Sequence, residues 1–336
     1  MPNTPPRDGF MNGLSLCLVP CILATNVPPV LSQFRRSAEE WLIRGDALAR
    51  EQNYEAALQA YDQAISIDPQ FARAWNNRGN ALRRLRNFTE AENSYRRSLQ
   101  IDAQDARTWN NLGNLYFDLR DLDRALEHYD RAIQLNPRLV QAWNNKGSVL
   151  RIRNRFPEAL QALNQAVRLD NNFAIAWNNL AILHGRMKKY QEAYAAVQQA
   201  VTIEPDNPDF RYRRAYALDD LGRYQEALAE FDRAISLLGE STWSSYPWHG
   251  KGLTLLKMKR YSEALNSFER AISLDRYRPD TDQDLVPADS WYGKGIALAQ
   301  LKRYREALDS FDQSLALKPN FPQAIRARQE TLKQLR

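Results

Sequence analysis

The sequence of 336 residues predicts an all-α protein in which short helix pairs repeat along the chain and stack into a solenoid. The first observation is a period of 34 residues shared by five tryptophans, Trp41, Trp75, Trp109, Trp143 and Trp177. The second is a glycine that follows four of these tryptophans at a constant offset of four residues. The third is that the sequence shows no strand-like alternation after residue 37. A fixed period of this length is typical of repeat architectures.

Each repeat divides into two helices of about 14 residues, a normal helix length. In 72–101, apolar or small residues recur at steps of three and four on both sides of a break at Arg86-Asn87, which predicts one buried face on each helix. Proline disfavours helical geometry in the residue before it, so it ends the second helix in several repeats, at Pro69, Pro137, Pro205 and Pro319.

The composition excludes several classes of protein. Charged residues make up 26% and hydrophobic residues 44% of the chain, which excludes a wholly disordered chain, a collagen and a multi-span membrane protein. Two cysteines exclude a disulfide framework. The 46 Lys and Arg exceed the 40 Asp and Glu by six, which favours an acidic partner without establishing nucleic-acid binding.

The repeated residues resemble the tetratricopeptide repeat (TPR) family, whose pattern places an aromatic residue, Leu-Gly, Tyr, Ala, Phe, Ala and Pro at set offsets over 34 residues. Departures from this pattern are Ala181 and Ala215 for the glycine and Arg211 for the tryptophan. The resemblance implies a right-handed TPR α-solenoid whose concave groove binds protein segments, closed by a capping helix at 322–336. Three residues are inserted at 242–244 and nine at 279–287, and the eight copies are 38–71, 72–105, 106–139, 140–173, 174–207, 208–241, 245–278 and 288–321.

The resemblance also places positions 2, 5, 6, 9, 12 and 13 of each first helix on the concave face. Asparagine is a poor residue inside a helix, yet it fills many of these positions. An amide carries donor and acceptor, which suits pairing with a peptide backbone, and the row resembles the asparagine ladder of the O-GlcNAc transferase TPR superhelix. The alternative is that these amides bond within the helix array. The residues are Asn76, Asn77, Asn80, Asn110, Asn111, Asn114, Asn144, Asn145, Asn178 and Asn179.

Arginines share this face, and their planar forks bind carboxylates with two hydrogen bonds. They predict an acidic peptide as the partner, with a merely solvated basic face as the alternative. The clamp by which some TPR relatives grip chaperone tails is not matched, because position 5 is never lysine. The arginines are Arg73, Arg83, Arg84, Arg107, Arg151, Arg186 and Arg213.

Aromatic residues replace the asparagines toward the C-terminus. Tyr212, Tyr216, His249 and Tyr292 stand at positions that face the groove, which predicts an apolar anchor site there. The alternative is that the nearby insertion repacks this region and buries some of them.

No catalytic residue, cofactor or metal site is predicted, so the protein is not expected to be an enzyme. The three histidines, His128, His184 and His249, lie in different repeats, and no motif of a hydrolase or phosphate-binding loop is present. The segment 280–284 resembles the start of a calcium loop but lacks its glycine and closing glutamate. The main alternative function is a nucleic-acid-binding helical repeat, which a steep salt dependence of binding would favour.

Residues 1–37 are rich in proline and are expected to form a disordered tail. The apolar run 14–24 is too short to span a membrane. We therefore expect a cytoplasmic protein, with membrane association or export through residues 11–31 as the alternative. Self-association through the convex faces stays open.

Overall fold

The computed structural model describes residues 29–275 and 286–335, and every regular element in these ranges is a helix. The first helices of the pairs are α1 (Pro29–Arg50), α3 (Ala72–Arg84), α5 (Ala106–Asp118), α7 (Val140–Ile152), α9 (Ala174–Arg186), α11 (Pro208–Asp220), α13 (Ser245–Lys257) and α15 (Val286–Gln300). The second helices are α2 (Tyr54–Ile67), α4 (Phe88–Ile101), α6 (Leu122–Leu135), α8 (Phe156–Leu169), α10 (Tyr190–Ile203), α12 (Tyr224–Leu238), α14 (Tyr261–Asp275) and α16 (Tyr304–Leu317). A short 3-10 turn, η1 (Thr242–Ser244), precedes α13, and α17 (Pro322–Lys333) follows α16.

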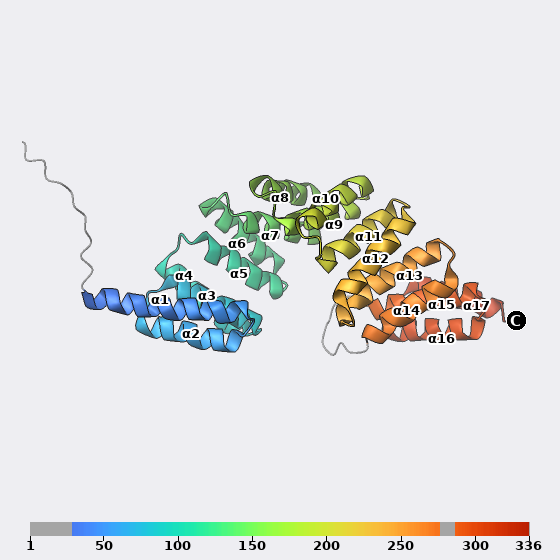
Figure 1. The fold of residues 1–336 in the computed structure, drawn as a ribbon, viewed down its shortest axis with the longest axis horizontal. Coiled ribbons are helices and arrows are strands. Elements are labelled where there is room, and N and C mark those ends of the chain that lie inside the picture. The colour runs from blue at the N-terminus through green and yellow to red at the C-terminus, as the bar shows by residue number, and fades with distance from the viewer. Residues whose placement is uncertain (1–28, 276–285, 336) are drawn as a thin grey trace, which may run out of the picture.

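The helix pairs stack in chain order into an arch (Figure 1). Each first helix packs against its own second helix and against the second helix of the preceding pair. Successive first helices also contact one another, as α5, α7 and α9 do. The first helices therefore share one continuous inner surface, as expected for a solenoid in which each unit touches only its neighbours.

A tight corner joins the two helices of each pair. In the second pair, Arg86 has a φ of 61°, the Asn87 N–H donates to the Leu82 carbonyl at 2.9 Å, and the Asn87 side chain accepts from the Glu90 N–H at 3.4 Å. These bonds end α3 in a Schellman motif and cap the start of α4. The same left-handed corner residue recurs at Gln52, Arg120, Asn154, Lys188, Gly222, Lys259 and Lys302.

The two helices of a pair meet where a glycine faces an aromatic ring. A Cβ atom on Gly113 would lie 2.6 Å from Cε1 of Tyr129, and Gly45 and Gly79 face their own tyrosines in the same way. The Tyr129 side chain is 1% exposed, so its ring has no free space to enter. Where Ala181 replaces the glycine, the residue sixteen positions later is the smaller Val197, which explains why the extra methyl group is accommodated.

In four successive repeats the tryptophan binds the turn that precedes its helix. The indole Nε1–H of Trp75 donates to the Pro69 carbonyl at 3.0 Å, and Trp109, Trp143 and Trp177 each donate to the carbonyl six residues earlier. At the departure from the pattern, Arg211 Nε donates to the Pro205 carbonyl at 2.7 Å. The guanidinium therefore supplies the N–H donor that the missing indole would have supplied.

The N-terminal boundary differs from the expectation. Helix α1 begins at Pro29, so residues 29–37, which were expected to belong to a disordered tail, are helical. Proline is favoured at the first helical position because its missing N–H is not needed there, and no glycine or second proline interrupts the eight residues that follow. Residues 1–28, the acidic segment 280–284 and most of the insertion 279–287 lie outside the described residues. No described helix is long and apolar enough to cross a membrane.

Candidate binding groove

The asparagine side chains on the inner surface form a chain of hydrogen bonds across successive repeats, which we call the amide ladder. Asn179 donates to Asn144 at 2.8 Å, Asn145 to Asn110 at 3.0 Å and Asn111 to Asn76 at 2.9 Å. Within three of the four repeats the first amide donates to the second, as Asn144 does to Asn145 at 3.2 Å. The links between repeats are normal hydrogen bonds, and every one of them donates toward the N-terminus.

The two amides of each pair differ in exposure. The first amides Asn110, Asn144 and Asn178 are 7%, 5% and 9% exposed, and Asn110 and Asn144 bond to other asparagines of the array. The second amides, Asn77, Asn111, Asn145 and Asn179, are partly exposed. An amide has two N–H donors and two acceptor lone pairs, and the ladder leaves some of this capacity unused. The second amides therefore bond to other asparagines of the array and also keep free donors or acceptors.

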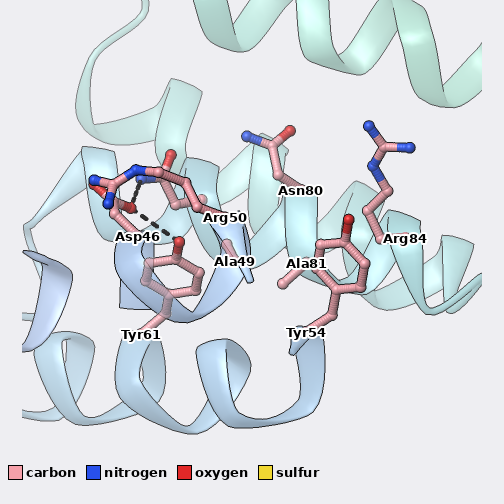
Figure 2. A pocket seen from close by; sticks show the side chains of 9 residues that line it. Asp46, Ala49, Arg50, Tyr54, Tyr61, Asn80, Ala81 and Arg84 are labelled. Atoms are coloured by element: carbon pink, nitrogen blue, oxygen red, sulfur yellow. Dashed lines mark hydrogen bonds between the residues drawn. The ribbon is translucent and has the colours of Figure 1, made fainter. Parts of the chain in front are cut away.

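The ladder ends at a carboxylate at its N-terminal side. Asp46 Oδ1 accepts from Asn77 at 2.8 Å and from the Tyr61 hydroxyl at 2.9 Å (Figure 2). Burial and the bond to Asp46 raise the pKa of Tyr61, which keeps its hydroxyl protonated as a donor. Asp46 stands at the ninth position of its repeat, as Asn80 does in the next one, so the position pattern could have identified it. These residues line a cavity of about 410 Å³ together with Ala49, Arg50, Tyr54, Ala81 and Arg84.

The asparagines at the ninth positions are also anchored. Tyr95 donates to Asn80 and Tyr129 to Asn114, each at 2.8 Å. Burial raises the pKa of both tyrosines, so their hydroxyls remain donors. Asn114 also accepts from Asn145 at 2.9 Å, which links the tyrosine of one repeat to the ladder.

A larger groove follows the ladder across α3 and α5. Its volume is about 720 Å³. Sequence reasoning missed the aspartates, Leu139 and Gln141 among its lining residues. The lining consists of Asp46, Ala72, Arg73, Asn76, Asn77, Asn80, Asp102, Asp105, Arg107, Asn110, Asn111, Leu139 and Gln141.

The arginines of this face fall into two groups. Arg83 pairs with Asp118 at 2.6 Å and Arg73 with Glu39 at 3.4 Å, so their charges are already compensated within the protein. Arg84 and Arg107 are exposed and have no ion-pair partner among residues 29–275 and 286–335. The groove is therefore less positive than the count of arginines suggests.

The aromatic residues of the C-terminal half pack mainly against the protein. Tyr216 lies edge-on to Phe231 with ring centroids 5.2 Å apart, and Tyr212 stacks on Tyr246 at 6.5 Å, next to the inserted turn η1. His249 was expected in the groove, but its Nδ1 is 2.9 Å from the Ser290 hydroxyl and its ring lies 5.7 Å from that of Phe268. The structure therefore removes His249 from the expected apolar anchor, because it bonds to the next repeat, and Tyr292 packs on Phe321 with ring centroids 5.1 Å apart. An anchor at Tyr212 and Tyr216 stays a prediction.

The family is decided by comparison with known proteins. A TPR family model described as "Cilia and flagella-associated protein 70 C-terminal domain" matches residues 72–271, more than half of the chain. Models described as "TPR repeat" and "Tetratricopeptide repeat" match residues 45–86 and 288–321. This chain belongs to the tetratricopeptide repeat family. A search of curated proteins finds no match to it.

Solved structures support the same TPR fold. The structure "APC/C hetero-tetramer Cut9-Hcn1" is similar with a TM-score of 0.68 and 17% identity over 90% of this chain, which spans 57% of the length of that chain. A tetratricopeptide repeat protein from Parabacteroides merdae has a TM-score of 0.56 and 18% identity, covering 76% of this chain and 98% of that one. The structure of Pseudomonas aeruginosa pilF has a TM-score of 0.55 and 19% identity, covering 61% of this chain and 93% of that one. At these identities the likeness concerns the fold alone, a fold typical of protein–protein interaction scaffolds.

The amide ladder should contribute measurably to the stability of this TPR array. We expect Asn145→Ala to lower the free energy of unfolding by about 1–3 kcal/mol, because it leaves the acceptors of Asn110 and Asn114 without this donor. Urea unfolding measures the change. The matched control is Asn172→Ala, an exposed amide with no side-chain bond in the described structure, which should change stability by less than about 0.5 kcal/mol. Equal losses in the two variants would contradict a stabilising ladder.

Proposed function

We propose that the protein is a non-catalytic scaffold that binds an extended segment of a partner protein along the amide ladder. The observation that carries the proposal is the groove of about 720 Å³ lined by partly bonded amides on α3 and α5. Because the ladder orients each amide, its unused donors and acceptors have defined directions before a partner arrives. Such preorganisation lowers the entropy cost of binding.

An extended segment suits this surface for a chemical reason. Its backbone offers N–H and C=O groups at regular intervals, whatever its side chains are, and the amides can pair with both. The exposed and unpaired Arg84 and Arg107 lie beside the amides and favour acidic side chains in the segment. Their small number makes charge a secondary contribution here, which favours a protein segment over a nucleic acid.

The histidines support a role without catalysis. Burial lowers the pKa of His128, His184 and His249. His128 is stacked between the rings of Trp109 and Tyr116, at 5.5 and 5.1 Å. Ser290, the hydroxyl next to His249, is 0% exposed and cannot reach a substrate. Within the described ranges no group of three or more His, Cys, Asp or Glu residues could hold a metal ion.

A selection of random 12-residue peptides displayed on phage, using the full chain as bait, tests the proposal. Substituting the amides would break the ladder, so the groove variant is Arg84→Gln with Arg107→Gln, the two exposed and unpaired arginines beside the amides. Its matched control is Arg131→Gln with Arg168→Gln, two exposed arginines on the second helices α6 and α8. We expect selected peptides to bind the groove variant several-fold more weakly than the control, with a shallow salt dependence.

Three results would contradict the proposal. The first is a selection that enriches no peptide above background. The second is an equal loss of affinity in the groove variant and its control, which would indicate unspecific attraction to positive charge. The third is binding of single-stranded RNA with a steep salt dependence, which would favour the nucleic-acid alternative.

A further inference from the structure

A further cavity is lined by residues of α9, α10 and α11, where the amide ladder stops. These helices lie near the crest of the arch (Figure 1). It has a volume of about 320 Å³. The apolar part of its lining includes Ala181, Ala217, Ile182 and Tyr216. The charged part of its lining consists of Arg186, Arg213 and Asp220.

The ladder stops here because one residue breaks its pattern. In each earlier link, the second amide of a repeat donates to the first amide of the preceding repeat, as Asn179 does to Asn144. At the next link the donor position holds Arg213 instead of asparagine. Asn178 Oδ1 and Arg213 Nε are both buried, and neither has a hydrogen-bond partner. Buried polar atoms normally have partners, so two such atoms at one place require an explanation.

Three arginines from three successive first helices converge on this region. They are Arg151 on α7, Arg186 on α9 and Arg213 on α11. Burial and the positive charges of Arg213 and Arg186 lower the pKa of Arg151, as expected for arginines that lie close together. Arg151 Nε is also buried without a partner.

No carboxylate of the described chain neutralises this group, which we call the arginine cluster. Arg186 donates to Asn154 at 3.1 Å, and Arg213 lies 5.2 Å over the Tyr212 ring. Asp220 borders the cavity but forms no ion pair there. Burial and the charge of Asp219 raise its pKa, while Lys257 opposes this effect. Other arginines of the same repeats are paired, namely Arg153 with Asp123, Arg155 with Glu158 and Arg214 with Glu230.

We propose that the arginine cluster of Arg151, Arg186 and Arg213 binds a carboxylate of the protein segment that lies along the ladder. Like charges held together at a partly buried site disfavour the empty protein, and an anion removes that penalty. The guanidinium forks match a planar carboxylate, and the apolar wall accepts the carbon chain attached to it. The inference rests on the proposed function for the segment, although the site itself can be tested alone.

The test uses butyrate, which has a carboxylate and a short apolar tail, with uncharged butyramide as the comparison. The readout is the NMR signals of the arginine Nε–H groups in the full chain. We expect butyrate, and not butyramide, to shift the signals of Arg151 and Arg213. Arg213→Gln should weaken butyrate binding at least tenfold, whereas Arg168→Gln on the outer face should leave it unchanged.

Thermal unfolding without ligand separates a binding role from a structural one. If the arginine cluster awaits an anion, Arg213→Gln relieves repulsion, and the Tm at low salt should stay equal or rise. A lower Tm, equal shifts with butyramide, or an equal loss in Arg168→Gln would each overturn the proposal. Two peptides then identify the source of the carboxylate, one with a free C-terminus and one with an internal glutamate and an amidated C-terminus. Failure of both to compete with butyrate would also overturn it.

The two proposals fail in different ways. If peptides are selected whose binding depends on Arg84 and Arg107 but not on Arg213, the proposal for the arginine cluster is wrong and the proposal for the groove is supported. Butyrate that binds at Arg213 while no peptide is selected would support the carboxylate site and contradict the groove.

Discussion

Gly113→Ala should lower the free energy of unfolding by about 1–3 kcal/mol, although alanine is the better helix former. The added Cβ would lie 2.6 Å from Cε1 and 2.7 Å from Cδ1 of Tyr129, closer than side-chain atoms pack. The ring is 1% exposed and its hydroxyl is bonded to Asn114, so α5 and α6 must move apart. Urea unfolding followed by circular dichroism measures the loss, and Gly113→Val should lose more because it adds two further methyl groups.

The chain offers a matched control in Gly185, which is also helical but has no atom within 4 Å of an added Cβ. Gly185→Ala should be neutral or stabilise by about 0.5–1 kcal/mol. Combining Gly113→Ala with Tyr129→Val imitates the natural pair of Ala181 and Val197, so the double variant should recover at least about 1 kcal/mol relative to the sum of the single changes. Strict additivity would show that the glycine and the tyrosine are not coupled.

His249 should make the protein less stable in acid. Burial lowers the pKa of this histidine from 6.5 to about 4, with Asp289 opposing the shift. Below a pH of about 6.5 this histidine binds a proton in the unfolded chain but not in the folded chain. The free energy of unfolding therefore falls as the pH drops from about 6.5 to about 4, and the stabilisation is fully present above that window. The accumulated loss is about 3 kcal/mol, since each pKa unit corresponds to about 1.4 kcal/mol.

The measurement compares the wild type with His249→Gln, which can keep a hydrogen bond to Ser290 but does not titrate. His128 and His184 also have lowered pKa values, so both proteins should lose stability in acid and the difference between them isolates His249. We expect the wild type to lose about 3 kcal/mol more than the variant between pH 7 and pH 4. Parallel curves would mean that His249 is protonated in the folded protein.

Much of the fold was predictable because most repeats have the same spacing of tryptophan, glycine and aromatic residues. The spacing of Trp109, Gly113 and Tyr129 follows helical periodicity, so the order of residues along the chain already indicates which helix faces meet. The start of α1 was not predictable in this way, because residues 29–37 lie outside the repeat pattern. Likewise, nothing in the sequence showed that Arg211 would use the hydrogen bond of the absent tryptophan.

The groove was harder to predict, because its chemistry depends on contacts between repeats. The sequence places Asn111 and Asn76 on one face, but their bond joins residues 35 positions apart and depends on how one pair rotates against the next. Arg83 and Asp118 are also 35 positions apart, and their pairing removes a charge that sequence reasoning assigned to a peptide. The burial of His249 depends on Ser290, 41 positions away in another repeat. In each case the deciding partner lies in a neighbouring repeat whose orientation is a tertiary property.

The amide ladder has a mechanical consequence. It joins the inner edges of α1, α3, α5, α7 and α9 to one another, so opening the arch in this part would stretch at least one hydrogen bond at each junction. At the junction of α9 with α11 that fastening is missing, since Asn178 Oδ1 has no donor. The arch therefore resists bending over its N-terminal half and is softest at its crest. A bound segment that contacts the repeats on both sides of this junction would restrict its bending and so stiffen the whole arch.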